Sequence, residues 1–127
     1  MFSHVMVGSN DLERSKRFYD ALFGAVGAKP GRQDDKGRLS YAHDGSVFMV
    51  SAPIDGQPAC SANGGTIGFR VDGPEGAQRW QEAGVAAGGT AIEDPPGYRE
   101  NAFGKLYLAY LRDPDGNKLC ALHRPPQ

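Results

Sequence analysis

The alternation of apolar and polar positions in the first third of the chain predicts a strand followed by a helix. Residues 2–9 are dense in apolar and β-favouring side chains and end at polar residues, a pattern typical of a strand covered on both faces. The helix is predicted to have Asn10 as its N-cap, with Glu13 three residues on, and to end at Gly24 or Gly27. Its buried face is expected to carry Leu12, Ser15, Phe18, Tyr19, Leu22 and Phe23.

Short β-favouring segments with turn signals come after this helix. A polar stretch at 31–37 precedes two apolar runs at 38–45 and 46–53, which predict two strands. Residues 55–65 contain small and turn-forming residues and no apolar period, so this segment is interpreted as a linker. The first half of the chain therefore predicts the order strand, helix, strands.

The second half repeats that order. Residues 66–71 predict a strand, and the helix after it ends in a glycine pair. Two further β-favouring runs lie at 105–111 and 117–123. The apolar stripe of the second helix is expected to consist of Ala77, Trp80, Gly84 and Ala87.

Sliding the chain on itself shows that the two halves are related. At an offset of 62 residues Val5 meets Ile67 and Phe18 meets Trp80. At an offset of 71, which is nine residues more, Asp44-Gly45 meets Asp115-Gly116. The nine extra residues are most simply placed in the loop at 92–104. Each copy has the pattern β-α-β-β-β, and a unit of about 60 residues buries too little surface to fold alone, so the two copies are expected to pack as a pair.

Length, composition and charge narrow the class of protein. The chain has 127 residues, which suits one domain, with modules at about 1–54 and 66–124 joined by the linker. With 14 basic and 15 acidic side chains it has no excess of positive charge that would attract nucleic acid or an anionic membrane. No apolar run is long enough to span a membrane. Two cysteines and no secretory leader pattern predict a reduced, cytoplasmic protein.

With these elements in place, the chain resembles the vicinal oxygen chelate superfamily, which includes glyoxalases, bleomycin resistance proteins and extradiol dioxygenases. The resemblance rests on "HVMVGSNDLERSKRFYDALFGAVG" in the first module and "YLRDPDGNKL" near the end of the second. It implies an α+β fold in which two tandem βαβββ modules form curved mixed sheets around a cavity. It also implies a small-molecule ligand in that cavity and a homodimer.

The same resemblance locates the positions at which the family binds a divalent metal such as Zn, Ni, Mn or Fe. The family's usual His and Glu ligands lie on the first and last strands of each module. Here those positions fall on His4, Met49, Thr66 and Cys120. A threonine hydroxyl and a thioether are poor replacements, and no carboxylate remains to balance the charge or act as a base. We therefore expect no cofactor of the usual kind, with binding of a divalent metal (Zn, Ni, Mn or Fe) as the alternative.

Two of these residues carry alternative interpretations. His4 is a candidate metal ligand or general base, and otherwise a hydrogen-bonded wall residue. Cys120 is a candidate thiolate ligand or nucleophile, and otherwise a small buried apolar residue. Together with Met49 they are also compatible with a soft Cu(I) site.

Further residues are candidates for contact with a ligand. Strand alternation places Met6 on the face of His4, and places Arg70 on the face of Thr66, where its guanidinium is suited to a carboxylate or phosphate. Arg99 belongs to the loop at 92–104, which is either a lid or an exposed turn. Two interpretations, packing in the sheet or lining the cavity, apply to the strand aromatics Tyr41, Phe48, Tyr107 and Tyr110.

Three functional hypotheses follow. The first is a metal-free protein that binds a small organic molecule, with Met6, Met49, Thr66, Arg70, Arg99 and Tyr107 as candidate contacts. The second is a metal-dependent lyase or isomerase of glyoxalase type that uses His4 and Cys120. The third is a domain whose cavity is filled by its own side chains.

Overall fold

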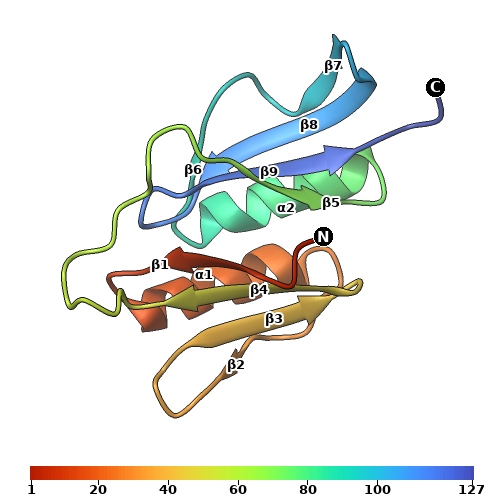
Figure 1. The fold of residues 1–127 in the computed structure, drawn as a ribbon. Coiled ribbons are helices and arrows are strands. Elements are labelled where there is room, and N and C mark those ends of the chain that lie inside the picture. Colours follow the sequence, from red (N-terminus) through yellow and green to blue (C-terminus); the bar gives the residue numbers. More distant parts are fainter.

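The first half of the molecule is a four-stranded mixed sheet with one helix. The computed structural model describes all residues 1–127 (Figure 1). The sheet order is β1-β4-β3-β2, with β1 parallel to β4 and the other pairs antiparallel. The elements are β1 (Val5–Gly8), α1 (Leu12–Gly24), β2 (Arg32–Gln33), β3 (Leu39–His43) and β4 (Ser46–Ser51).

The second half has the same plan with one more strand. Its sheet has the order β5-β9-β8-β6, and β7 pairs with β8 as well. No ladder joins the two sheets, so β1 and β5 are edge strands that face each other near the middle of the molecule (Figure 1). The elements are β5 (Ile67–Arg70), α2 (Pro74–Ala86), β6 (Thr90–Ala91), β7 (Gly97–Asn101), β8 (Gly104–Arg112) and β9 (Lys118–His123).

Strand register confirms the internal repeat. In the first sheet Met6 lies opposite Met49, and in the second sheet Gly68 lies opposite Cys120. Gly68 follows Met6 by 62 residues and Cys120 follows Met49 by 71, so the two sheets pair equivalent positions of the repeat. The repeat is therefore a relation between two sheets of the same topology.

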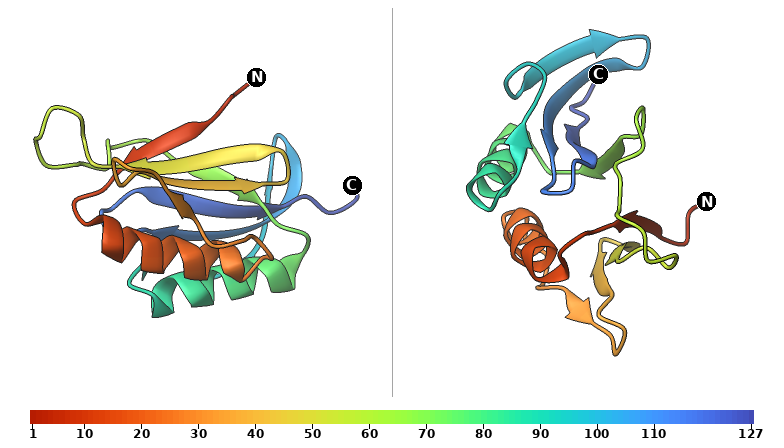
Figure 2. Two further views of the ribbon diagram at one scale, coloured as in Figure 1. Left: turned by 90° about the horizontal axis from the view of Figure 1, so that it is seen from below. Right: turned by 90° about the vertical axis from the view of Figure 1, so that its left-hand side faces the viewer.

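The two helices lie side by side and cover the same face of both sheets (Figure 2). We call this the covered face and the other the open face. The prediction that the first strand is covered on both faces is wrong, because Val5 and Val7 pack on the core whereas Met6 is 45% exposed on the open face. Each helix has 13 residues, and neither is long and apolar enough to cross a membrane.

The predicted start of α1 is also corrected by the structure. Asp11, not Asn10, is the N-cap, and its carboxylate accepts a hydrogen bond from the Arg14 N–H at 3.0 Å. The Asn10 side chain instead exchanges two hydrogen bonds with the backbone of Ala59, at 2.7 and 3.2 Å. Asn10 thus anchors the linker to α1, a contact between residues far apart in sequence that a local capping pattern does not contain.

The segment 92–104, expected to be a loop, contains a strand. β7 pairs antiparallel with the start of β8, and Asn101 and Gly104 close the hairpin between them. Most of the residues inserted in the second half therefore extend its sheet. Gly104 has φ +104°, a conformation that favours glycine at such a turn.

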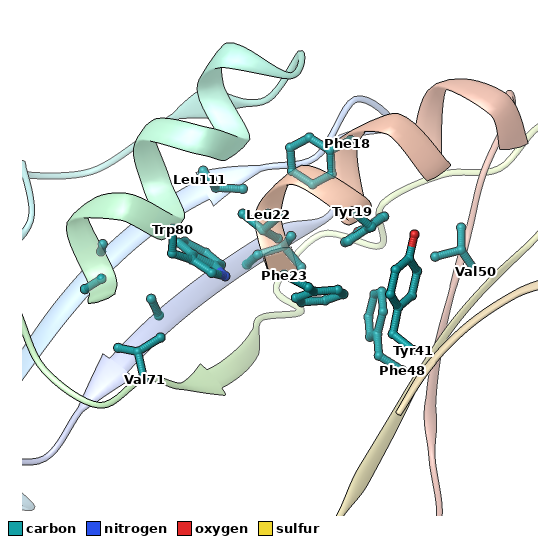
Figure 3. Packing of buried hydrophobic residues seen from close by; sticks show 14 of the residues in the cluster. Phe18, Tyr19, Leu22, Phe23, Tyr41, Phe48, Val50, Val71, Trp80 and Leu111 are labelled. Carbon is teal, nitrogen blue, oxygen red and sulfur yellow. The ribbon is translucent and has the colours of Figure 1, made fainter. Parts of the chain in front are cut away.

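Both halves contribute to one hydrophobic core under the covered face. The ring centroids of Phe23 and Phe69 are 5.1 Å apart, and those of Phe48 and Phe69 are 5.4 Å apart, so aromatic contacts cross from one half to the other. Trp80, fully buried, belongs to the same core (Figure 3). A shared core is the solution expected for two units that are each too small to fold alone.

At the end of the molecule where α1 begins, the turn between β8 and β9 meets the first half through buried carboxylates. Asp113 accepts hydrogen bonds from the Tyr19 hydroxyl at 2.5 Å and from the Asn117 side-chain amide at 2.8 Å. Burial and the nearby Asp113 carboxylate raise the pKa of Tyr19 well above its ordinary value, so this hydroxyl stays a donor.

A second aspartate of the same turn completes the junction. Asp115 accepts a hydrogen bond from the Asn10 N–H at 2.9 Å and pairs with the Arg14 guanidinium at 2.8 Å. We call Asn10, Arg14, Tyr19, Asp113 and Asp115 the polar clamp. The "DPDGN" motif therefore docks the second half onto the first helix as well as forming a turn.

Candidate functional site

At the end of the molecule opposite the polar clamp, a groove of about 350 Å³ lies between the two halves. It is bounded by the start of β1, the end of α1, the β3–β4 turn and β5. Of its 18 lining residues 11 are hydrophobic, a composition typical of sites for small organic molecules. The groove arises because the edge strands β1 and β5 approach each other without pairing.

Aromatic rings form the inner wall of the groove. Phe23 lies 5.1 Å from Tyr41 and 5.5 Å from Phe48, measured between ring centroids. Phe69 and Trp80, 6.4 Å apart, continue this wall into the second half. Figure 3 shows Phe23 between Trp80 from α2 and the pair Tyr41 and Phe48 from β3 and β4.

Tyr41 is held in place by hydrogen bonds to Asp20 of α1. The Tyr41 hydroxyl donates to Asp20 at 2.8 Å, and the same carboxylate accepts from the Gly31 N–H at 2.9 Å and from the Lys16 ammonium at 2.6 Å. Burial acts to raise the pKa of Asp20, but these donors outweigh it and lower the pKa below its ordinary value. The position of one groove wall thus depends on an ionised carboxylate.

Trp80 leaves a polar atom without a partner beside the groove. Its side chain is fully buried, and its indole Nε1 donates no hydrogen bond. Figure 3 shows this nitrogen at the edge of the ring that faces Phe23. Nearly all buried donors in native proteins are satisfied, and an unsatisfied one costs about 1–3 kcal/mol. The indole N–H is therefore a donor to which a ligand in the groove could supply the acceptor.

Charged and titratable side chains line the mouth of the groove. Arg70 makes no ion pair or hydrogen bond to any other residue, and it is exposed. His4 is also exposed, and its Nδ1 lies 2.8 Å from the Ser3 hydroxyl. On the other side His43 faces Asp44, with Nε2 and Oδ2 3.5 Å apart. Of the predicted site residues, the groove therefore brings together His4 and Arg70.

The side chains at the positions where the family binds metal are a poor match for its usual metals. His4 and Met49 belong to the first half, whereas Thr66 and Cys120 belong to the second. The set offers an imidazole, a thioether, a hydroxyl and a thiol, and no group of three His, Cys, Asp or Glu residues lies close enough to hold an ion. Divalent Zn, Ni, Mn or Fe prefers nitrogen, carboxylate or thiolate donors, so the residues present do not fit such a metal.

Cys120 lies in a small apolar cluster on the open face of the second sheet. It is 5% exposed and packs with Leu106 and Leu108. Burial raises the pKa of the thiol, although a hydrogen bond from Tyr110 acts in the opposite direction. A protonated, buried thiol is poorly suited to act as a nucleophile or a metal ligand.

The remaining predicted contacts lie outside the groove. Met6 and Met49 face each other on the open face of the first sheet, and Thr66 is exposed just before β5. The Arg99 guanidinium donates to the carbonyls of residues 94 and 95, so it supports the loop before β7. Tyr107 lies on the covered face, where its hydroxyl accepts a hydrogen bond from Gln78 at 2.8 Å.

Sequence reasoning did not assign the aromatic wall to a site. Phe23 and Trp80 lie on predicted helical stripes, so their periodicity indicated packing only. For Tyr41 and Phe48, strand alternation left two interpretations open, packing in the sheet or a place in the pocket wall, and the structure gives them both roles. One signal was present in the sequence. The repeat relates Phe18 to Trp80, and Phe23 lies on the same helix as Phe18, so packing the two copies as a pair brings aromatic residues of both helices close together.

Comparison with known proteins gives a consistent result. Residues 1–121 match the family model described as the Glyoxalase/Bleomycin resistance protein/Dioxygenase superfamily. No curated protein sequence matches the chain significantly.

Solved structures with the same fold include one with high sequence identity. The crystal structure of a glyoxalase/bleomycin resistance protein from Albidiferax ferrireducens T118 is 57% identical, with a TM-score of 0.94 over 98% of this chain and 99% of that one. A glyoxalase/bleomycin resistance protein/dioxygenase family enzyme from Burkholderia phytofirmans PsJN is 21% identical, with a TM-score of 0.72 over 95% and 96% of the two chains. Fosfomycin resistance protein FosX from Mesorhizobium loti is 15% identical, with a TM-score of 0.68 over 98% and 92%; these two show the fold alone.

Proposed function

Because the chain belongs to the Glyoxalase/Bleomycin resistance protein/Dioxygenase superfamily, we propose that it binds a small organic molecule in the groove without the family's usual His and Glu metal ligands. The observation that carries this proposal is the groove itself. It combines an aromatic wall, a polar mouth and the unpartnered donor of Trp80. Sites for small molecules have this composition, with mostly apolar walls and a few polar groups that fix orientation.

Each part of the groove has a role in such binding. The wall that contains Phe23, Tyr41 and Phe48 is closely packed, with these rings only 4–6% exposed, and gives the groove an apolar inner surface for a ligand. An acceptor atom that reached the Trp80 indole would satisfy a buried donor and so recover the free energy that this donor costs the unliganded protein. Binding therefore requires no metal and no covalent step.

Gly68 allows a direct test of the groove. This residue lines it, and a Cβ at Gly68 would have no atom within 4 Å, so a longer side chain there occupies free space at the mouth. We expect calorimetry on chelator-treated protein to show one site per chain for a two-ring aromatic probe such as 1-naphthoate or 1-naphthamide. Gly68→Met should abolish this binding.

The matched control is Gly24→Met, at a helix end outside the groove where a Cβ also has no atom within 4 Å. This variant should bind the probe as the parent protein does. If neither probe binds, or if Gly68→Met binds as well as the parent, the proposal fails.

The metal-dependent alternative keeps His4 and Cys120 as ligands. Its support is that both occupy positions which the resemblance assigns to ligands. Against it stand the raised pKa of the Cys120 thiol and the thioether and hydroxyl at the positions of Met49 and Thr66, which are poor donors for these metals. Stoichiometric Zn, Ni, Mn or Fe that is lost in both His4→Ala and Cys120→Ser would favour this alternative over metal-free binding.

We also infer that the chain forms a homodimer. Phe2 is 81% exposed and Met6 is 45% exposed, both on or beside β1, and apolar side chains exposed this close together are typical of interaction surfaces. Sedimentation equilibrium should give twice the mass of one chain, and Phe2→Ser with Met6→Ser should shift it toward one chain. A parent protein that sediments as a monomer at all concentrations would contradict this.

A further inference from the structure

We propose that the ligand is a compact planar aromatic acid whose carboxylate binds Arg70 at the mouth and whose rings lie against the aromatic wall. This inference rests on the proposed function and names the class of molecule that the groove takes. It depends on three features of the groove: the unpaired guanidinium, the ring faces and the limited volume.

The first feature is the free guanidinium of Arg70. Its residue is the last of β5, and no carboxylate or carbonyl of the chain accepts a hydrogen bond from it. Other arginines are unpaired as well, namely Arg17, Arg32 and Arg124, but Arg70 is the one arginine that lines the groove. A guanidinium presents a planar fork of donors that matches the two oxygens of a carboxylate, so Arg70 is a ready anchor for an acid.

The second feature is the distribution of charge around the mouth. Asp44 is the one acidic residue among the lining side chains, and it faces His43 at 3.5 Å. Arg70, on the strand of the other half, has no acidic neighbour in a salt bridge. An anion is therefore favoured on the β5 side of the mouth and disfavoured on the side of the β3–β4 turn, which gives the acid one orientation.

The third feature is the shape of the wall behind Arg70. Phe69 precedes Arg70 on β5, and the centroid of its ring lies 5.1 Å from Phe23 and 5.4 Å from Phe48. Phe69 is the ring of this wall that is only partly buried, and a flat, rigid ring system can lie against it with little loss of conformational freedom. The volume of about 350 Å³ is near the lower end of the roughly 300–1,000 Å³ range of ligand sites, which excludes bulky ligands.

The experiment compares two probes of nearly equal shape, the anion 1-naphthoate and the neutral 1-naphthamide. Calorimetric titrations are made with the parent protein, Arg70→Gln and the matched control Arg17→Gln. Arg17 is exposed on α1, has no hydrogen-bond partner and is not part of the groove. Unfolding curves in urea show that each variant is folded before binding is measured.

We expect the parent protein to bind 1-naphthoate more tightly than 1-naphthamide. Arg70→Gln should weaken naphthoate binding about fivefold, the effect of a partly exposed ion pair, and should leave naphthamide binding unchanged. Arg17→Gln should bind both probes as the parent does. Raising the salt concentration should reduce the difference between the probes in the parent protein and have no such effect in Arg70→Gln.

Each other outcome overturns the inference. If both probes bind equally to the parent protein, or if Arg70→Gln weakens both alike, the acid is not recognised, although the groove still binds small molecules. If neither probe binds, the proposed function fails with it. If Gly68→Met converts a dimer into monomers and no probe binds, a second copy of the chain fills the groove instead.

Discussion

The two ends of the molecule join the same pair of halves in opposite ways. At the polar clamp, Asp113 and Asp115 from the second half satisfy donors from the start of α1. At the groove, the halves meet through aromatic rings, and the Trp80 indole and the Arg70 guanidinium have no partners. The clamp is held by several hydrogen bonds and an ion pair, although the buried Nε of Arg14 has no partner there. The groove end has no polar contact between the halves of this kind, and it is the end that is open to another molecule.

The largest effect is expected at the polar clamp. Asp113→Ala removes the acceptor of the Tyr19 hydroxyl and of the Asn117 amide inside the protein. Because several buried donors lose their partner together, the free energy of unfolding should fall by about 3 kcal/mol or more. Urea unfolding measures this loss, and Asp35→Ala, at an exposed position without hydrogen bonds, should stay within about 0.5 kcal/mol of the parent. If Asp113→Ala were as stable as Asp35→Ala, the polar clamp would not be the end of the molecule that stabilises the contact between the halves.

A smaller effect is expected at Asp20, which supports the groove wall. Asp20→Ala leaves the Tyr41 hydroxyl and the Gly31 N–H without their acceptor and should lower the free energy of unfolding by about 2 kcal/mol. Asp20→Asn keeps an oxygen for both donors and should recover part of the loss. An Asn variant as unstable as the Ala variant would show that the two hydrogen bonds contribute little.

The pH dependence of Asp20 follows from its lowered pKa. The pKa in the folded protein lies below that of the unfolded chain, about 3.9, so the folded state binds the proton more weakly. The contribution to stability is complete above the unfolded-state pKa and is lost as the pH falls through the folded-state pKa. The difference in unfolding free energy between parent and Asp20→Ala should therefore be larger at pH 7 than at pH 3. A difference independent of pH would contradict this origin.

The smallest stability change is expected at the groove and has the opposite sign. Gly68→Met adds a side chain in free space and replaces a glycine within a strand, so it should raise the free energy of unfolding by about 0.5–1 kcal/mol. Urea unfolding measures the gain. A loss of stability instead would mean that the mouth of the groove has no room for a side chain. That result would weaken the contrast between a satisfied end and an open end.

Much of the fold could be predicted from the sequence because repeat and periodicity are local signals. Offsets of 62 and 71 residues carry the strand pair Met6 and Met49 onto the pair Gly68 and Cys120, so the repeat found in the sequence agrees with the observed register. The strand β7 could not be predicted in this way, since its partner is the start of β8 and its sequence has no apolar alternation. The N-cap was misplaced because Asn10 bonds to the distant residue Ala59.

The candidate site was less predictable for a physical reason. His4 was found from the family resemblance and Arg70 from strand alternation, and both line the groove. The aromatic wall depends on how the covered faces of the two sheets meet. Helical periodicity assigns Phe23 and Trp80 to the core whether or not they also line a groove. An unsatisfied donor such as the Trp80 indole exists only once every neighbour is in place.

The most direct test of a metal-free ligand groove uses the single tryptophan of the chain. In chelator-treated, ¹⁵N-labelled protein, Trp80 gives one indole N–H resonance, reporting from the wall of the groove. Titration with 1-naphthoate should move this resonance saturably and with the affinity that calorimetry gives, and Gly68→Met should prevent the shift. An indole resonance that stays unchanged while the probe binds elsewhere, or binding that requires added metal, would contradict the account.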